Sequence, residues 1–269
     1  MRQPLVNIGI QAATRAGAVI TRYANRLDQL SVQEKEGHDF VTEVDRAAEK
    51  EILHVLQRAY PNIPVVTEEA GTVGGDDKLL REGTHWIVDP LDGTTNFIHG
   101  VPHYSISLAY QEHGELHHGV IFDPVRNELF SASRGGGAYC NETRMRISER
   151  RHFDQCLLAT GFPFKRRQRR DRYMAIFGSM FDAVADMRRA GSAALDLAYV
   201  AAGRLDGFWE MGLSSWDIAA GALLVREAGG TVCDFTGGKD FLDTGDVIAG
   251  SIRSVAEMRK IIDANATSE

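Results

Sequence analysis

Residues 86–97 read Trp-Ile-Val-Asp-Pro-Leu-Asp-Gly-Thr-Thr-Asn-Phe, and our interpretation of the fold starts from this stretch. Its apolar beginning is typical of a buried strand, which we expect to stop at Asp89. Pro90 cannot donate a hydrogen bond to a neighbouring strand, so the chain is predicted to turn there. Gly93 allows the backbone to approach a ligand closely. The stretch therefore places two carboxylates, Asp89 and Asp92, beside exposed backbone N–H groups.

Carboxylates and N–H groups at one place indicate a particular chemistry. Carboxylate oxygens hold hard divalent cations such as Mg²⁺, and N–H groups at the start of a helix hold phosphate. A metal ion and a phosphate at the end of one strand suggest phosphoryl chemistry. The alternative is an ordinary surface turn, since Asp, Pro and Gly are common turn residues. The complete string is far more specific than an Asp-Pro pair, and two further acidic motifs support the metal site.

The composition is that of an ordinary globular protein. Hydrophobic residues make up 43% of the 269 residues and charged residues 25%, which allows a large core. The net charge of −7 argues against a surface that binds nucleic acid generally. No apolar stretch is long enough to span a membrane and no hydrophobic signal sequence follows Met1, so we expect a cytoplasmic protein. Its widely spaced cysteines, Cys140, Cys156 and Cys233, are expected to be reduced thiols.

The N-terminal part is predicted to contain two amphipathic helices. Apolar residues recur at three- and four-residue steps over 5–27 and over 43–60, where Pro61 ends the second helix. Residues 64–67 are typical of a short strand. The segment 71–83, which is rich in glycine and charged residues, is predicted to be a mobile loop.

The pattern then changes from helical to alternating. Period-two alternation over 105–110, and more loosely over 119–123 and 128–133, indicates an antiparallel sheet in the middle third. Helices and strands alternate in the C-terminal part. The helices are predicted at 173–186, 192–202, 216–228 and 255–262, and the strands at 207–211, 231–234 and 247–249. These elements suggest an α+β fold of stacked layers. We expect a single domain, 1–269, with halves at about 1–147 and 148–269.

Four further acids have settings similar to those of the first motif. Glu68 and Glu69 end the short strand, Asp45 lies in the first turn of the second helix, and Asp217 follows Trp216 at the start of another helix. An acid in a first helical turn can simply balance the helix dipole, and paired Glu residues are usually solvated. Each of these acids taken alone is therefore equivocal.

Together these motifs identify the chain as similar to the inositol monophosphatase family, within the Mg²⁺-dependent, lithium-sensitive phosphatases. The resemblance covers roughly residues 5–250. It implies a layered α/β/α/β/α fold and a homodimer. The matching positions are the string Asp89–Asn96, the string Trp216–Gly221, the pair Glu68-Glu69, Lys35, Asp45 and the run Gly191–Ala194.

The resemblance also implies a set of metal ligands. Glu68, Asp89 and the carbonyl of Leu91 would hold one Mg²⁺, and Asp89, Asp92 and Asp217 would hold a second. Glu68 would help with a third, weaker ion, which gives two to three Mg²⁺ in the site. Asp89 would bridge the first two ions, as in two-metal phosphatases.

A catalytic arrangement follows from the same resemblance. A water on the first ion would be the nucleophile, oriented by Thr94, whose hydroxyl would be hydrogen-bonded to Asp45, with Glu68 nearby. The second ion would stabilise the leaving alkoxide, and lithium would compete at its position. The N–H groups of Gly93 and Thr94 would bind phosphate oxygens, and no phosphoenzyme is expected.

The substrate implied by the resemblance is inositol 1-phosphate or a related polyol phosphate. Asp92, the Ala193 backbone, Glu210 and Asp217 match the positions that face the inositol ring. Glu210 lies in an apolar run and therefore requires a hydrogen-bonding partner, for which a structural salt bridge is the alternative to a polyol hydroxyl. If the protein is an enzyme, the alternative substrates are fructose 1,6-bisphosphate and 3′-phosphoadenosine 5′-phosphate.

A basic segment stands outside the catalytic set. Six of eight consecutive residues are basic: Lys165, Arg166, Arg167, Arg169, Arg170 and Arg172. A solvated loop and helix start would explain them, but basic residues in a first helical turn oppose the helix dipole, which favours a contact with an anion, RNA or a protein.

The strings at 159–165 and 188–199 resemble the bacterial branch of the family, which is linked to RNA polymerase and the Nus factors. A second function class is therefore a transcription antitermination and ribosomal RNA maturation factor whose phosphatase activity is secondary. A pure scaffold is argued against by six intact residues that it would not need: Asp45, Glu68, Asp89, Asp92, Thr94 and Asp217.

The sequence also predicts where several histidines and tryptophans lie. His113, His117 and His118 flank a predicted hairpin without a carboxylate cluster, so they are interpreted as surface residues. Trp86 and Trp209 are predicted to lie in the core.

Overall fold

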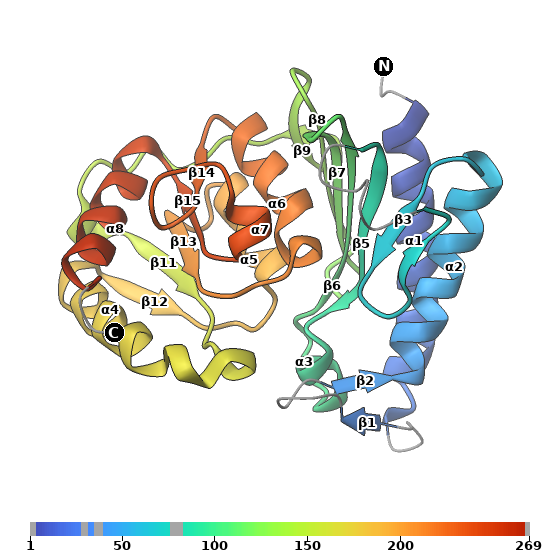
Figure 1. The fold of residues 1–269 in the computed structure, drawn as a ribbon, viewed down its shortest axis with the longest axis horizontal. Coiled ribbons are helices and arrows are strands. Elements are labelled where there is room, and N and C mark those ends of the chain that lie inside the picture. The colour runs from blue at the N-terminus through green and yellow to red at the C-terminus, as the bar shows by residue number, and fades with distance from the viewer. Residues whose placement is uncertain (1–3, 28–31, 35–39, 76–82, 267–269) are drawn as a thin grey trace.

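The computed structural model describes residues 4–27, 32–34, 40–75 and 83–266 of the chain. Helices and sheets alternate in stacked layers, α/β/α/β/α, across the long axis of the molecule (Figure 1). The outer and middle layers are pairs of helices. They are α1 (Pro4–Ala24) with α2 (Glu43–Ala59), α5 (Ala193–Ala201) with α6 (Ser215–Glu227), and α4 (Arg170–Ala183) with α8 (Ile252–Ala264). The α+β layered fold expected from the sequence is confirmed.

The larger sheet has eight strands, in the order β10-β9-β8-β7-β6-β5-β3-β4. All neighbours are antiparallel except β3 and β5, which are parallel. The bounds, in chain order, are β3 (Val65–Thr67), β4 (Gly71–Val73), β5 (His85–Asp92), β6 (Ser105–Glu112), β7 (Glu115–Asp123), β8 (Glu128–Ser133), β9 (Gly137–Cys140) and β10 (Thr143–Arg144). The antiparallel middle third predicted from period-two alternation is thus present.

The smaller sheet has five strands, in the order β12-β11-β13-β15-β14. β11 (Leu157–Thr160) is parallel to β12 (Asp186–Arg188) and β13 (Gly207–Glu210), whereas β15 (Val247–Gly250) is antiparallel to β13 and β14 (Thr231–Cys233). The remaining elements are short. They are β1 (Val32–Glu34), β2 (Phe40–Thr42), α3 (Thr94–Ile98), α7 (Phe241–Thr244) and the 3-10 helices η3 (Phe153–Gln155) and η4 (Phe164–Arg169).

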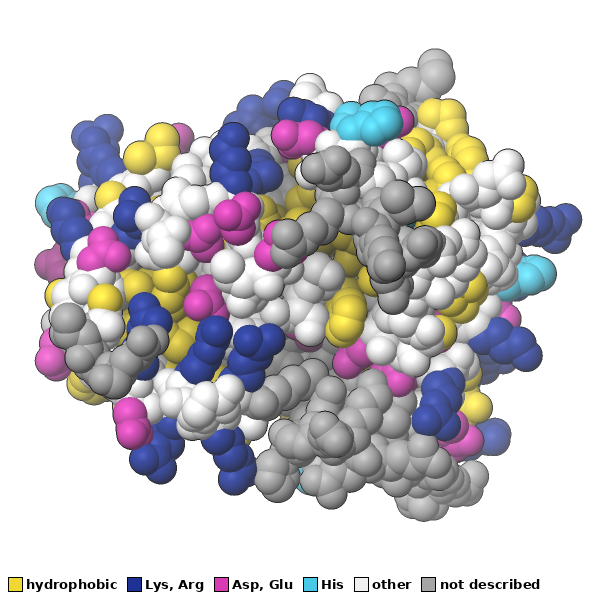
Figure 2. Space-filling view, viewed as in Figure 1, with side chains coloured by type: hydrophobic (Ala, Val, Ile, Leu, Met, Phe, Trp, Pro, Cys, Tyr) yellow, Lys and Arg dark blue, Asp and Glu magenta, His cyan; other side chains and the backbone are white. Residues whose placement is uncertain are grey.

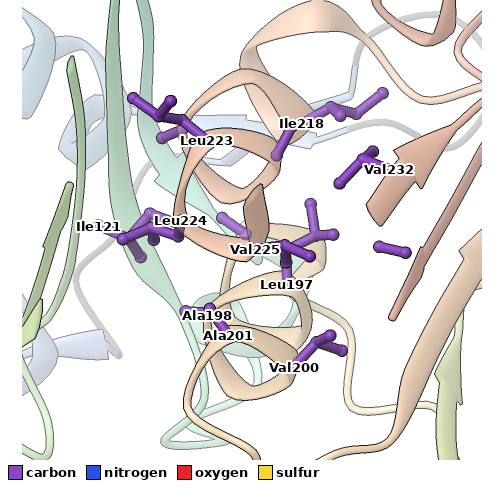
Figure 3. Close-up of a cluster of buried hydrophobic side chains, with 14 of the residues drawn as sticks. Ile121, Leu197, Ala198, Val200, Ala201, Ile218, Leu223, Leu224, Val225 and Val232 are labelled. Carbon is purple, nitrogen blue, oxygen red and sulfur yellow. The ribbon is translucent and has the colours of Figure 1, made fainter. Parts of the chain in front are cut away.

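The middle helices form the centre of the core because they are apolar on all sides. Every residue of α6 from Ile218 to Val225 is buried, as expected for a helix between two sheets. Leu224 lies beside Ile121 of β7 in the larger sheet (Figure 3). Gly221 has no side chain where α6 meets Leu197 of α5; a Cβ there would overlap that leucine. The close approach of α5 and α6 fixes their N-termini, which is where the site is built.

Strand β5 corrects one prediction from the sequence. The strand was expected to stop at Asp89, but it continues to Asp92. Its pairing with β6 shifts register between Asp89 and Asp92. Pro90 has no N–H to give to the ladder, so a local irregularity of this kind accommodates it inside a strand. Both carboxylates consequently lie on a strand end, and not on a free turn.

Other boundaries differ from the predictions as well. The helix expected at 173–186 begins earlier, at Arg170, and ends at Ala183, so that Asp186 opens β12. The loop expected at 71–83 contains β4, and residues 76–82 of it lie outside the described part. β11 was not predicted, because a strand of four residues between loops has little pattern.

His118 is buried, which corrects the prediction of a surface residue. The residue is 3% exposed, its ring stacks on Tyr110, and its Nδ1 lies 3.0 Å from the Ser133 hydroxyl. His113 is exposed in the turn between β6 and β7, as expected. Trp86 and Trp209 lie in the core, as predicted. None of the helices among the described residues is long and apolar enough to cross a membrane.

Candidate active site

A cavity of about 470 Å³ opens where several elements of the two sheets and the middle helices end. Its walls come from the C-terminal end of β5, the start of α3, the N-termini of α5 and α6, the end of β13 and the segment that follows β11. The volume lies within the range of about 300–1,000 Å³ that small-molecule sites occupy. Most of the residues singled out in the sequence line this one cavity.

Three aspartates converge at one end of the cavity. Asp89 and Asp92 come from β5 and Asp217 from the first turn of α6, more than a hundred residues later. One carboxylate oxygen from each lies within 4.8 Å of the others. Oxygen ligands at this separation suit a hard divalent cation. The sequence predicted these residues as ligands, and the fold brings them together.

Asp89 is the electrostatic centre of this cluster. It is 1% exposed, and burial raises its pKa well above the ordinary value, with the Glu68, Asp92 and Asp217 carboxylates raising it further. The Leu91 N–H donates to Asp89 Oδ1 at 2.9 Å, which opposes that shift only in part. A buried carboxylate among like charges is costly unless a cation neutralises it. The residues present therefore fit a bound metal ion.

Asp92 is held by the N-terminus of α5. Its Oδ2 accepts hydrogen bonds from the Ser192 hydroxyl at 2.6 Å and the Ala194 N–H at 2.8 Å. The Asn96 side chain donates to the carbonyls of His103, at 2.7 Å, and Ala190, at 2.9 Å. Except for the bond to His103, these bonds join segments about a hundred residues apart in the sequence. The orientation of Asp92 is thus fixed by contacts across the two predicted halves of the chain.

Asp217 is oriented by a capping box at the start of α6. The Ser214 N–H donates to Asp217 Oδ2 at 2.7 Å, and the Ser214 hydroxyl accepts from the backbone of Asp217. The same geometry that satisfies the helix N-terminus therefore aims this carboxylate at the cavity. The role of Asp217 as a helix cap and its place in the acidic cluster are compatible, although the sequence presented them as alternatives.

Thr94 and Asp45 form a second arrangement beside the acidic cluster. The Thr94 hydroxyl lies 2.9 Å from both Asp45 Oδ1 and the Leu91 carbonyl. Asp45 is fixed by Thr42, whose N–H and hydroxyl donate to its Oδ2 at 2.7 and 2.5 Å. Burial raises the pKa of Asp45, and the hydrogen bonds from Thr42 and Thr94 oppose the rise. Since the Thr94 hydroxyl donates to an acceptor behind it, its oxygen can accept a hydrogen bond from the cavity.

Glu68 lines the cavity from the turn between β3 and β4, and a residue missed in the sequence positions that turn. Glu49, buried on α2, accepts three hydrogen bonds at Oε2. The donors are the Thr67 hydroxyl at 2.7 Å, the Glu69 N–H at 3.2 Å and the Ala70 N–H at 3.3 Å. Asp45 and Glu49 are four residues apart and so share one helix face. That spacing was the available signal for Glu49.

Gly93 adopts a conformation that requires glycine. Its φ is +97°, and a Cβ there would lie 3.1 Å from the His103 carbonyl and 3.2 Å from that of Gly191. The residue precedes α3, so the backbone N–H groups of the first turn begin immediately after it. Gly93 and Thr94 both line the cavity, as their predicted phosphate-binding role requires.

The opposite wall carries a second pair of carboxyl groups. Glu210, at the end of β13, lies directly over Gly161, where any Cβ would overlap the Glu210 carboxylate. Asp196 on α5 is 2% exposed and lines the same cavity, as does Ala193. Burial raises the pKa of Asp196 well above its ordinary value, Glu210 and Asp92 raise it further, and Arg189 opposes them.

Asp196 was missed in the sequence. The only signal was an acid inside the apolar run 193–199, a position where a carboxyl needs a partner or a proton. Lys35, which matched the family pattern, lies outside the described residues.

The basic segment 165–172 does not act as one unit. Arg166 and Arg167 line the cavity, whereas Arg169 forms an ion pair with Asp246 and Arg170 with Asp171. On the face drawn in Figure 2, Lys and Arg side chains are distributed among Asp and Glu side chains and do not form one continuous basic surface. Part of this segment therefore lines the same cavity as the three aspartates.

Comparisons with known proteins agree with this geometry. A model of the inositol monophosphatase family matches residues 1–267. The chain is 53% identical over 255 residues to the Nus factor SuhB of Pseudomonas aeruginosa, covering 93% of each chain. A crystal structure of the extragenic suppressor protein suhB from Bartonella henselae superposes with a TM-score of 0.92 at 42% identity, covering 97% of this chain and 98% of that one. An inositol monophosphatase from Anabaena superposes with a TM-score of 0.86 at 34% identity, covering 97% and 95%.

Proposed function

Because this chain belongs to the inositol monophosphatase family, we propose that it is a Mg²⁺-dependent phosphomonoesterase acting on inositol 1-phosphate or a related polyol phosphate. The observation that carries the proposal is the convergence of Asp89, Asp92 and Asp217 within 4.8 Å at one end of a cavity. Helix capping would explain the position of Asp217 by itself, and an ordinary turn would explain that of Asp92 by itself. Neither explains a fully buried Asp89 surrounded by other carboxylates.

The proposed metal content is two to three Mg²⁺. Glu68, Asp89 and the Leu91 carbonyl are the proposed ligands of one ion, and Asp89, Asp92 and Asp217 those of a second, with Glu68 assisting a third. When bound, such ions lower the pKa of water and stabilise charge on both sides of the reacting phosphorus.

The protein groups around the ions have separate proposed tasks. Thr94 accepts a hydrogen bond from the attacking water while its own proton remains on the bond to Asp45 or Leu91. Glu68 lies beside the same water, and the N–H groups of Gly93 and Thr94 hold the phosphate oxygens. No covalent intermediate with the protein is needed.

The wall that holds Glu210 would bind the alcohol part of the substrate. Asp92, the Ala193 backbone, Glu210 and Asp217 are its proposed contacts. The raised pKa of Asp196 favours its protonated form, which can donate a hydrogen bond while the Glu210 carboxyl oxygens accept one, and a hydroxyl group needs both. This pairing favours a polyol over an apolar alcohol.

Phosphate release from inositol 1-phosphate with Mg²⁺ tests the proposal. Wild type and Asp92→Asn would be measured in parallel, with lithium as an inhibitor. Rapid Mg²⁺-dependent release that the substitution greatly reduces supports the phosphatase. Release by Asp92→Asn at the wild-type rate contradicts the metal assignment, because that substitution removes a charged ligand from the proposed second ion.

A second candidate function comes from the names of the relatives. Since the chain is 53% identical to a protein named a Nus factor, we propose that it also associates with the transcription machinery, as an antitermination and ribosomal RNA maturation factor. RNA polymerase and Nus factors are the proposed partners, with the exposed Arg170 as part of the contact. A homodimer in the cytoplasm is the proposed state of the protein.

Two substitutions separate these functions. Arg170→Glu should weaken the capture of RNA polymerase or Nus factors while phosphate release continues, and Asp92→Asn should do the reverse. Capture by Arg170→Glu that equals wild type removes this residue from the contact. Loss of capture in Asp92→Asn would instead connect partner binding to the active site.

A further inference from the structure

Three arginines line the wall of the cavity around the segment that follows β11. They are Arg166 and Arg167 of η4 and Arg189, which follows β12. Within the part of the chain that the structure describes, none of the three forms an ion pair with a carboxylate, and all are exposed toward solvent. A neutral polyol attached to one phosphate would bring no second anion to these cations.

Neighbouring arginines show that this arrangement is selective. Arg169, on the same segment as Arg166, is paired with Asp246, and Arg188, next to Arg189, is paired with Asp186. Neither Arg169 nor Arg188 lines the cavity. These two neighbours outside the cavity are thus paired, whereas the three arginines that line it form no ion pair with a described carboxylate.

Local packing holds two of the three in place. The Arg189 guanidinium lies over the rings of Phe162 and Phe164, 5.5 and 5.7 Å from their centroids. Both rings are unusually open for phenylalanine, at 36% and 52% exposed. A cation over an aromatic face is stabilised by the ring quadrupole, so the rings fix the direction of Arg189 without removing its charge.

Arg166 packs against the loop that leads into α6. A Cβ at Gly212 would come within 2.9 Å of the Arg166 side chain, so glycine at that position leaves room for it. Asp246 accepts both from Arg169 and from the Gly212 N–H at 3.0 Å, which ties η4 to the same loop. Arg166 is consequently held beside the cavity and is not a freely extended side chain.

From this arrangement we propose that Arg166, Arg167 and Arg189 form a second anion subsite, and that the preferred substrate carries a second phosphate group. The inference rests on the phosphatase proposed above and names its substrate class more closely. The acidic end of the cavity takes the phosphate that is cleaved, and the three guanidinium groups take the other. A guanidinium offers planar N–H donors that match phosphate oxygens, often two at a time.

Hydrolysis of matched esters tests this subsite. Inositol 1-phosphate and inositol 1,4-bisphosphate would be compared as substrates of wild type, of the double variant Arg166→Gln/Arg167→Gln, and of Arg188→Gln. Arg188 is the matched control, because it is exposed, paired with Asp186 and outside the cavity. All three positions are at the surface, so the variants should fold.

We expect wild type and Arg188→Gln to use the bisphosphate with a kcat/KM about tenfold or more above that of the monophosphate, given the strength of charge-assisted contacts. The double variant should lose most of this preference, and added salt should lower it in wild type. A wild type that uses both esters equally, or a double variant with unchanged preference, overturns the subsite while the phosphatase stands.

Binding separates the subsite from the phosphatase proposal. If neither ester is hydrolysed, the phosphatase proposal fails, and calorimetric titration of inositol 1,4-bisphosphate with Mg²⁺ then decides the subsite. Tighter binding by wild type and Arg188→Gln than by the double variant supports it. Equal binding of the bisphosphate by all three proteins overturns the subsite. It is also overturned if the double variant binds the bisphosphate like wild type and has lost only the capture of RNA or of a protein partner.

Discussion

The two ends of the cavity are built in different ways. At the acidic end, Asp89 is buried and Asp45, Asp92 and Asp217 each accept hydrogen bonds that fix an oxygen. At the basic end, the arginines are exposed and are positioned by ring faces and glycine contacts, which are weaker and fewer. A site that must stabilise a transition state needs preorganised charge, whereas a site that only recognises a substrate tolerates adaptable contacts.

The comparison also explains which elements carry each end. The acidic end uses β5 and α6, which belong to the larger sheet and the apolar middle helix layer. The basic end uses η4, a short 3-10 helix with a non-helical Arg166 inside it. Changes at the acidic end should therefore alter turnover strongly, and changes at the other wall should alter mainly the choice of substrate.

Asp89→Asn should have the largest effect. Phosphate release is expected to fall by roughly a thousandfold, because bound metal ions contribute several kcal/mol to catalysis. Without Mg²⁺ the same variant should unfold at a higher temperature than wild type, since it removes a buried charge among carboxylates. Calorimetric melting with and without Mg²⁺ measures this. A variant that is less stable than wild type in the absence of metal would contradict the electrostatic account of the cluster.

Glu49→Ala should have the second-largest effect, although Glu49 does not line the cavity. It removes the acceptor of three hydrogen bonds in the turn that carries Glu68. We expect a loss of about 2–3 kcal/mol in the free energy of unfolding, from unsatisfied buried donors. Turnover should fall about 10- to 100-fold, as for other residues that orient metal ligands.

Urea unfolding and the Mg²⁺ dependence of turnover check the Glu49 prediction. Glu49→Gln is the control, because its amide oxygen keeps an acceptor in place and should restore much of the stability. Unchanged Mg²⁺ dependence in Glu49→Ala would show that the turn holds Glu68 without this residue.

The sequence predicted stacked helices and strands from local pattern, whereas the grouping of Asp89, Asp92 and Asp217 was implied only by the resemblance to the family. The spacing of apolar residues and the residues at helix ends indicated most of the helices. The string around Asp89 and Asp92 is specific enough to indicate a metal site. The predicted end of β5 at Asp89 was wrong, because the strand tolerates Pro90 at a register shift. That shift can be recognised only from the pairing of β5 with β6. The division of the chain into halves stays a prediction, as do the roles of the individual site residues.

Residues whose partners are distant could not be recognised in the same way. Glu49 and Asp196 are ordinary helix acids by sequence, and their environments are set by other segments: Thr67 is 18 residues from Glu49, and Glu210 follows Asp196 on another element. The basic segment looked uniform, but whether each arginine is paired depends on acids such as Asp246, 77 residues from Arg169. Charge pattern alone does not give pairing, since pairing is a tertiary property.

Gly161→Ala should have a moderate effect confined to substrate choice. The new Cβ would overlap the Glu210 carboxylate and displace it from the cavity wall. We expect kcat/KM for inositol 1-phosphate to fall about tenfold, the cost of losing a well-placed hydrogen bond to a hydroxyl. An ester without hydroxyls, such as phenyl phosphate, is the control and should be hydrolysed nearly as before. An equal loss with both esters would place Glu210 outside alcohol recognition.

Asp196→Asn should have the smallest effect on turnover and a distinct effect on stability. Since the pKa of Asp196 is raised in the folded state, that state binds a proton more tightly than the unfolded chain does. Wild-type stability therefore falls as pH rises above about 4, the unfolded pKa, and continues to fall up to the raised value. Asparagine has no such proton to lose.

Asp196→Asn should accordingly match wild type near pH 4 and become the more stable of the two toward pH 8. Urea unfolding at a series of pH values measures the difference. Asp186→Asn is the control with the opposite sign, because Arg188 lowers the pKa of that exposed carboxyl and its contribution to stability is lost as pH falls. If Asp196→Asn and wild type keep a constant difference across the series, Asp196 does not hold a proton in the folded protein. The donor half of the hydroxyl-binding wall would then be absent, and Glu210 alone would have to position the alcohol.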